Sequence, residues 1–379
     1  GLNEGEKIFQ EIELTVRGQT EGIKEESTID LTAEDGELHA FPSTGICRTW
    51  RKEPLNEAEL NIIRETGFSH YRIEIDLTSE EWQSFVTDAC AEAALLNLPV
   101  ELALFLDDNA VEQCTAVTGL LDYLHPDIIL LIVYHKYQPC TPDELSDAII
   151  PLLRSSLPGI RIACGTNANF AQMNRNRPRS LMPDLRCWSI HPQEHASDYA
   201  TLVENLRAQA CTVESARDFR PQKDIWITPV TIARRFNANL GFHTDINRND
   251  EYPAADLRLK DMRGACWVAG SFKYLAESGV AGISFLETAG DAGIIDSGSL
   301  DGQEGKMNGE KVCLFPVSHL FRFLLKHKEY KILTLKSTDR LSAEALGLVH
   351  GTLLVLAVIN YTPEPKVVRI NLGRDLQIT

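Results

Sequence analysis

Short apolar segments recur along this chain from about residue 40, and stretches of helical length separate them. These segments predict strands over 43–49, 70–77, 99–106, 128–135, 160–166, 187–191, 225–231 and 281–287. Amphipathic stretches predict helices over 55–66, 79–96, 141–153, 200–219 and 257–278. Such alternation is typical of βα units and a parallel sheet. We therefore predict an α/β fold, with eight units closed into a (β/α)8 TIM barrel.

An open, doubly wound sheet is the alternative arrangement of such units. It would need a glycine-rich nucleotide loop, and neither G-x-G-x-x-G nor G-x-x-x-x-G-K-[ST] occurs in the sequence. The serine nucleophile of a G-x-S-x-G turn is also absent, which excludes an α/β-hydrolase mechanism. We expect no cofactor.

The texture of the sequence changes after about residue 325. Short β-rich runs at 331–336, 343–350, 353–360 and 366–371 predict an antiparallel meander, half of a small β-sandwich-like module. Residues 8–18 alternate like a strand that we expect to join this sheet, and 17–37 read as a linker. The predicted domains are therefore 1–38 (part of the β module), 39–325 (the barrel) and 326–379 (the C-terminal β module).

Charge and hydropathy exclude two classes of partner. The chain has 37 basic and 54 acidic residues, a net charge of −17, which repels nucleic-acid phosphates and anionic lipid. No apolar run approaches the ~20 residues of a membrane helix. We expect neither nucleic acid nor a membrane as a partner, and the sequence leaves the oligomeric state open.

The nine cysteines are odd in number and widely spaced, and no C-x-x-C pair occurs. This pattern favours reduced thiols and a bacterial cytoplasmic location over a disulfide framework or a zinc knuckle. No secretion signal is visible in the first residues. The chain begins at Gly1 rather than at Met, so secretion of a processed fragment stays an alternative.

Polar clusters follow several predicted strands, where a (β/α)8 barrel places its reacting groups. Among them we predict four catalytic residues: His135, His195, Asp198 and Glu287. We predict that the substrate is bound by Asn167, Asn174, Arg175, Gln193, Glu194, Arg235 and Asn237.

Glu287 ends the last predicted strand, and Ile283 and Phe285 share its side if the strand alternates regularly. Apolar walls would raise the pKa of this carboxyl and suit it to acid–base work. The alternative is an ion pair with an interior arginine such as Arg72. Arg72, Glu74 and Glu101 have the period-two spacing of an internal charge network.

His191, Glu194 and His195 match the H-x-x-E-H pattern of inverted zinc proteases. That chemistry needs both histidines on one helix face, whereas Pro192 follows the first histidine and the segment leaves a strand. We therefore expect no metal, with a hydrolytic metal on these three residues as the lesser alternative. We expect His191 to hydrogen-bond to a neighbouring barrel strand.

A barrel with an appended β module is common among carbohydrate enzymes, and a retaining glycosidase needs two carboxylates about 5 Å apart. In the large barrel group of these enzymes the acid ends the fourth strand and the nucleophile the seventh. Here those strands end in His135-Lys136 and Pro229-Val230-Thr231, so neither carboxylate is present.

The loops resemble the D-apionate lactonase family. The resemblance is carried by Gly165-Thr166, Asn169-Phe170, 174–178, Pro192-Gln193, His195-Ala196, Asp198, 229–231, 235–237, Glu287-Thr288 and Gly290. It implies a bacterial enzyme that opens D-apionolactone to D-apionate in the breakdown of apiose. Glu194, Ser197, Ala233 and 289–291 depart from the family pattern and leave the exact substrate open.

Lactone hydrolysis needs a base to activate water, donors for the carbonyl oxygen and an acid for the leaving oxygen. Glu287 or the pair His195 and Asp198 is the candidate base, and His135 the candidate acid. Candidate oxyanion donors are Arg235, Asn174 and Asn167. Two alternatives stay open: a glycosidase with a displaced carboxylate pair, for example Glu287 with Glu194, and a sugar-binding barrel without catalysis.

Overall fold

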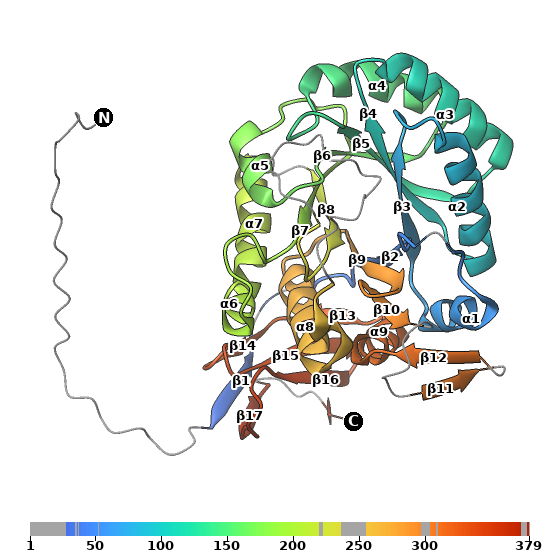
Figure 1. Cartoon of the computed structure of the whole chain (residues 1–379). Helices are drawn as coiled ribbons and strands as arrows, with labels where there is room; N and C mark the ends of the chain where they lie inside the picture. Colours follow the sequence, from blue (N-terminus) through green and yellow to red (C-terminus); the bar gives the residue numbers. More distant parts are fainter. Residues whose placement is uncertain are drawn as a thin grey trace, which may run out of the picture.

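Eight parallel strands form a closed ring with helices outside it (Figure 1). The computed structural model describes residues 28–34, 36, 38–51, 53–219, 223–235, 255–296, 304–307, 310–372 and 377–378. The ring strands are β2 (Ser43–Cys47), β3 (His70–Asp76), β4 (Val100–Leu106), β5 (Ile128–His135), β6 (Arg161–Thr166), β7 (Leu185–Ile190), β8 (Asp224–Val230) and β9 (Gly282–Ala289). Because β9 pairs with both β8 and β2, the ring is closed, and the predicted TIM barrel is confirmed.

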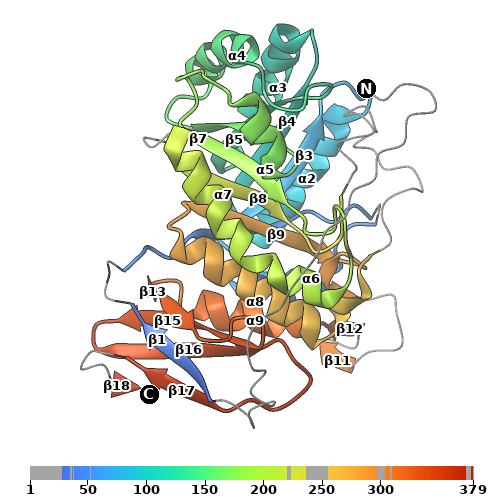
Figure 2. The ribbon, with the colours of Figure 1, turned by 90° about the vertical axis from the view of Figure 1, so that its left-hand side faces the viewer.

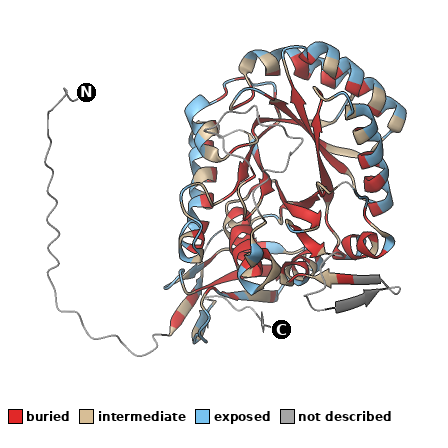
Figure 3. Cartoon of the chain, viewed as in Figure 1, coloured by how far each residue is buried: buried red, intermediate tan, exposed pale blue. Residues whose placement is uncertain are grey.

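Helices cover the outside of the ring and bury apolar faces against it (Figure 3). They are α1 (Glu57–Thr66), α2 (Trp82–Leu96), α3 (Ala110–Leu124), α4 (Asp143–Ser156), α5 (Phe170–Asn176), α6 (Tyr199–Glu204), α7 (Leu206–Phe219), the 3₁₀ helix η1 (Leu257–Lys260), α8 (Met262–Glu277) and α9 (Pro316–Lys326). Two predicted helices are each divided in two. The division at Asn205 separates α6 from α7, and Asp261 caps a new helix after η1.

The inside of the ring holds an apolar layer and a polar layer. Ala103, Ile132, Leu185 and Trp226 belong to the apolar layer. Glu101 is fully buried and accepts hydrogen bonds from Trp226 Nε1 at 2.8 Å and from Ser284. Burial alone raises the pKa of Glu101, but His70 and Arg72 outweigh it and lower the pKa to about 2. This layer is a satisfied ionic network that ties four strands together.

Three short strands extend the sheet beyond β9. β10 (Gly293–Asp296) runs parallel to β9, and β12 (Glu310–Leu314) and β11 (Glu304–Met307) follow in antiparallel order. The pairing of Gly293 with Glu287 and of Ile295 with Ala289 lengthens the support for the end of β9.

Two small sheets form a β module beside α8 (Figure 2). One has the order β13-β15-β16-β18, with β13 (Lys331–Leu333), β15 (Ala343–His350), β16 (Leu353–Asn360) and β18 (Gln377–Ile378). The other has the order β14-β1-β17, with β14 (Leu335–Ser337), β1 (Ile29–Ala33) and β17 (Val368–Asn371). The antiparallel meander from β13 through β15 to β16 agrees with the sequence prediction.

Two expectations about this module were wrong. Residues 29–33 lie inside the predicted linker but form β1, in which Ile29 and Leu31 are buried and Asp30 and Thr32 are not. The last strand predicted from the sequence, 366–371, corresponds to β17, which does not continue the meander but pairs parallel with β1. The alternation of apolar and polar residues over 29–33 spans only five positions among acidic neighbours. It was too short to be recognised as a strand from the sequence. Residues 8–18 lie outside the described residues, and the domain boundaries at 38 and 325 stay predictions.

Among the described residues, no helix is both long enough and apolar enough to cross a membrane.

Candidate active site

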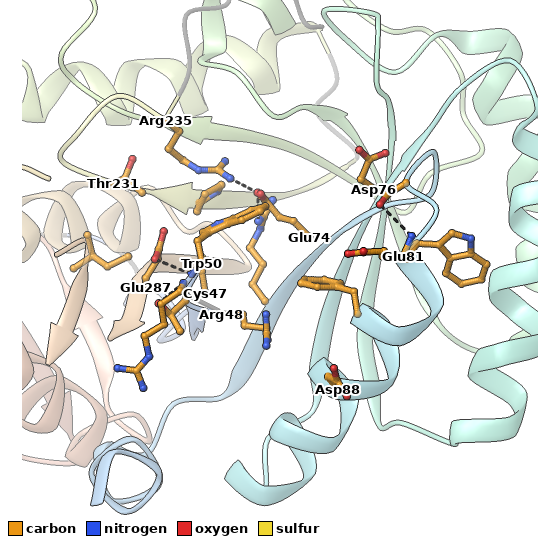
Figure 4. A pocket seen from close by; sticks show the side chains of 18 residues that line it. Cys47, Arg48, Trp50, Glu74, Asp76, Glu81, Asp88, Thr231, Arg235 and Glu287 are labelled. Carbon is orange, nitrogen blue, oxygen red and sulfur yellow. Dashed lines mark hydrogen bonds and ion pairs between the residues drawn. The ribbon is translucent and has the colours of Figure 1, made fainter. Parts of the chain in front are cut away.

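A cavity of about 630 Å³ opens at the carboxyl ends of β2, β3, β8 and β9 (Figure 4). Its lining residues are Cys47, Arg48, Thr49, Trp50, Arg51, Arg72, Glu74, Asp76, Ser79, Glu81, Trp82, Phe85, Asp88, Pro229, Thr231, Arg235, Leu286 and Glu287. This is the end of the barrel at which reacting groups are expected. The cavity therefore lies where the first two and the last two ring strands meet.

Glu287 faces this cavity because β9 is irregular. Along the pairing with β2, Ile46 lies opposite Phe285 and Cys47 opposite Glu287, so Leu286 is an extra residue, with a φ of 38°. Phe285 consequently packs outward on Phe272 and Phe321. The prediction that Phe285 and Ile283 share the side of Glu287 was wrong, since regular alternation does not hold across such a bulge.

The Glu287 carboxylate is buried, with 8% of the residue exposed, and its Oε2 accepts a hydrogen bond from the backbone nitrogen of Trp50 at 3.2 Å. Thr49 Oγ1 donates to the carbonyl of Ala289 at 2.9 Å, which fastens the end of β2 to the end of β9. The segment after β2 thus holds the carboxylate in place.

An ion-pair network forms the floor of the cavity. Glu74 pairs with both Arg72 and Arg235. Asn167 Oδ1 accepts from Arg235 Nη1 at 2.9 Å and lies 3.4 Å from Arg72 Nη2. The predicted internal network of Arg72, Glu74 and Glu101 is present, and Arg235 extends it.

Two other lining residues are Asp76 and Cys47. Lys136 Nζ lies 2.9 Å from Asp76 Oδ2 and 2.7 Å from Thr78 Oγ1. Burial raises the pKa of the Cys47 thiol to about 12, although the charges of Arg72 and Arg235 lower it. Cys47 is therefore a neutral thiol at ordinary pH and a poor nucleophile.

The structure brings three of the predicted site residues together: Glu287, Arg235 and Asn167. The others that it describes lie elsewhere. His135 Nε2 lies 3.4 Å from Asp108, outside the cavity. Asn174 and Arg175 are exposed on α5, where Asn174 accepts from Arg177.

The predicted pair after β7 is not assembled. His195 is exposed, and Asp198 caps α6 by accepting from Thr201. Hydrogen bonds from the Thr201 backbone and hydroxyl lower the pKa of Asp198. Gln193 donates to the carbonyl of Ile232 at 3.0 Å. Asn237 lies outside the described residues.

His191 and Glu194 lie beside the ion-pair network of the floor and do not line the cavity. His191 Nε2 is 3.4 Å from Glu194 Oε1, which also accepts from Asn169 at 3.0 Å. Neither ring nitrogen of His191 has a hydrogen-bond partner among the described residues, so the expected bond to a neighbouring strand is not formed there. Burial, followed by the charges of Arg235 and Arg234, lowers the pKa of His191 to about 4.

The described residues contain no group of three or more histidine, cysteine, aspartate or glutamate side chains placed to hold a metal ion. The alternative zinc set also lacks its third member, because the exposed His195 is not brought to His191 and Glu194.

Comparison with known proteins identifies the family. Residues 44–329 match the family described as D-apionate lactonase, TIM barrel domain. The chain belongs to the D-apionate lactonase family. This member of the family is therefore a carbohydrate-active hydrolase. No curated protein sequence matches it.

Solved structures share the fold of this D-apionate lactonase family member. A family 51 α-L-arabinofuranosidase from Bifidobacterium longum is 9% identical with a TM-score of 0.59, covering 91% of this chain and 88% of its own. A family 51 α-L-arabinofuranosidase from Thermotoga petrophila RKU-1 is 11% identical with a TM-score of 0.57. The match covers 90% of this chain and 88% of the other. A glucosidase from Croceicoccus marinus is 10% identical with a TM-score of 0.51. The match covers 84% of this chain and 74% of the other. At these identities the similarity shows the fold alone.

Sequence reasoning missed the wall that this family member builds from the segments after β2 and β3. Arg48, Trp50, Trp82 and Phe85 line the cavity there. The sequence R-T-W-R directly after the first predicted strand is as polar and aromatic as the loops that we selected, and the barrel rule applies to it equally. The same rule would therefore have selected Arg48 and Trp50 from the sequence.

Proposed function

We propose that this chain hydrolyses a sugar-acid lactone, opening D-apionolactone to D-apionate. The observation that carries the proposal is the buried carboxylate of Glu287, which faces the cavity at the end of β9 in a member of this family. The substrate is a small neutral molecule, which suits a cavity of about 630 Å³.

Glu287 acts as the general base in this reaction. It takes a proton from water as the water oxygen bonds to the lactone carbonyl carbon. The carbonyl oxygen then carries the negative charge until the ring C–O bond breaks. The ring oxygen leaves with the electron pair and receives the proton back from Glu287, giving the hydroxy acid.

The ionic partners of two other cavity carboxylates, Glu74 and Asp76, favour this reaction over glycoside cleavage. Glu74 lies between two arginines and Asp76 pairs with Lys136, so both carboxylates are already engaged by cationic side chains. A retaining glycosidase needs one carboxyl that stays protonated as an acid beside the nucleophile. Glu194, the displaced partner considered from sequence, does not line the cavity.

We assign a substrate contact to Arg235 at the floor, where it would bind a ring hydroxyl group, with Asn167 holding its guanidinium in place. A cytoplasmic location is part of the proposal. All nine cysteines are unpaired, which supports a reducing compartment.

The test is to offer purified protein D-apionolactone and a panel of aryl glycosides, and to follow acid release and aglycone release separately. We expect acid release alone, and it should be lost in Glu287→Gln. Aglycone release without acid release would establish a glycosidase instead. Binding of the lactone without either product would leave a sugar-binding barrel.

A further inference from the structure

The four arginines that line the cavity differ in how far their donors are already used. Arg51 donates to Glu59 and to the carbonyls of Glu53 and Pro54. Arg72 donates to Thr228, Glu74 and Asn167. These two guanidinium groups are built into the protein and have little left to offer a ligand.

Arg235 donates to Glu74 and to Asn167 at the floor, and in the proposed reaction it contacts a ring hydroxyl group rather than the carbonyl oxygen. Arg48 differs. Its Nε forms an ion pair with Glu92 Oε1 at 3.2 Å but no hydrogen bond, and its terminal nitrogens have no partner among the described residues. Arg48 thus lines the cavity with donors that remain available to a ligand.

The Arg48 guanidinium is nevertheless held in place. Its central carbon lies 5.0 Å from the centroid of the Phe85 ring, a cation–π contact that restrains the group. Glu92, which holds the Nε edge, is itself fixed by the Tyr71 hydroxyl at 2.5 Å. Phe85 and Glu92 thus restrain Arg48, while no described residue hydrogen-bonds to its two terminal nitrogens.

Arg48 is also close in the fold to Glu287. Its neighbour Cys47 is the register partner of Glu287 across β2 and β9. Two residues further on, the backbone nitrogen of Trp50 binds the Glu287 carboxylate. A base and an uncommitted donor therefore line one cavity, on neighbouring segments (Figure 4).

We propose that Arg48 is the oxyanion donor of the reaction. Its terminal nitrogens hydrogen-bond to the lactone carbonyl oxygen and stabilise the negative charge that forms there when water attacks. This inference rests on the proposed lactone hydrolysis and adds a catalytic residue that we did not select from the sequence. A pre-positioned donor stabilises the transition state without reorganising at the moment of reaction.

The test compares Arg48→Ala and Arg48→Lys with Arg154→Gln, which removes an arginine that pairs with Asp184 on the protein surface. Rates are measured on the lactone, with and without added guanidinium ion, and each variant is melted. We expect Arg48→Ala to lose about 10²–10³ in kcat, the usual cost of one oxyanion donor. Guanidinium should restore part of that loss, Arg48→Lys should fall between, and Arg154→Gln should match the wild type.

Three results would overturn the inference. A rise in KM at unchanged kcat would make Arg48 a contact of the ground state only. A lower melting temperature with kcat within a few-fold of wild type would make it a structural residue. Loss of activity in Arg48→Ala without any rescue by guanidinium would point to collapse of the wall. If the wild type does not hydrolyse the lactone, the proposed function fails first, and that outcome is distinct from all three.

Discussion

Replacing Glu287 by glutamine removes a charge while keeping an oxygen that can accept from the Trp50 backbone. We expect Glu287→Gln to fold normally and to lose about 10²–10⁴ in kcat, which is the usual contribution of a positioned acid–base group. Substrate affinity should change far less, because the amide keeps the shape. Steady-state kinetics and a thermal melt on this one variant measure both quantities.

The competing account of Glu287 is a purely structural ion pair. In that case the same variant would melt at a lower temperature and turn over within a few-fold of the wild type. Such a result would remove Glu287 from the mechanism. Because His195 and Asp198 do not reach the cavity, it would not transfer the role to them.

His191 provides a pH-dependent prediction. Its pKa is lowered to about 4 in the folded protein, so below its ordinary value of 6.5 the unfolded chain binds a proton that the folded one does not. Stability should therefore fall as pH falls from about 6.5 to 4, by up to about 3 kcal/mol. Urea unfolding at several pH values should show a smaller fall in His191→Gln. Equal slopes in the two proteins would contradict this, and His125→Asn, at an exposed histidine, is the matched control.

At the scale of elements, the strands were predictable because an apolar run of six to eight residues is a property of the local sequence. The predicted ranges 128–135, 343–350 and 353–360 agree with the structure to the residue. The site was less predictable, because asparagine and aspartate after a strand can either bind substrate or cap the next helix. Asn169 and Asp198 follow barrel strands as substrate-binding residues do, yet both cap helices.

The side on which Glu287 lies shows a different limit. Counting by two along 283–287 gives the wrong neighbours because Leu286 is an extra residue in β9. A bulge depends on pairing with the adjacent strand, which the sequence of one strand does not contain. The sequence analysis expected Glu287 to face the cavity through regular alternation with Ile283 and Phe285. It faces the cavity because of the bulge at Leu286.

β2 packs too closely on His70 to accept a side chain at Gly45. A Cβ there would lie 2.1 Å from His70 Nε2, and His70 is held by Ser43 at 3.2 Å and Ser284 at 2.8 Å. We expect Gly45→Ala to lower the free energy of unfolding by about 1–3 kcal/mol, as overpacking does. Chemical denaturation measures it.

Gly119 is the matched control for Gly45, since it lies in α3 with nothing within 4 Å of an added Cβ. Gly119→Ala should raise stability by about 0.5–1 kcal/mol through helix propensity. If Gly45→Ala behaved like Gly119→Ala, the packing around His70 would be looser than described.

At the scale of the whole molecule, Glu277 joins the barrel to the β module. Its carboxylate lies 2.8 Å from Lys273 Nζ and accepts from the backbone of Leu335 at 3.1 Å. Burial raises the pKa of Glu277 to about 7, although Lys273 opposes this. The folded protein therefore keeps this proton in a range where the unfolded chain has lost it.

Stability should consequently fall as pH rises from about 4.5 to 7, opposite in sign to the effect of His191. In Glu277→Gln this component should disappear, so the change in unfolding free energy between pH 5 and pH 8 should differ from that of the wild type. Comparing the pH dependence of the unfolding free energy of each variant with that of the wild type separates the contribution of Glu277 from that of His191. A Glu277→Gln profile parallel to the wild type would show that the junction does not titrate.

The contact between Glu287 and Trp50 spans 237 positions of the sequence. During synthesis from the N-terminus, the wall after β2 leaves the ribosome long before the strand that carries the carboxylate. Under the proposed mechanism the chain is inert until its last ring strand has been made and inserted between β8 and β2. Prematurely terminated products that stop before β9 would lack this acid–base group altogether. Onset of turnover in a cell-free translation reaction would then report the closing of the barrel.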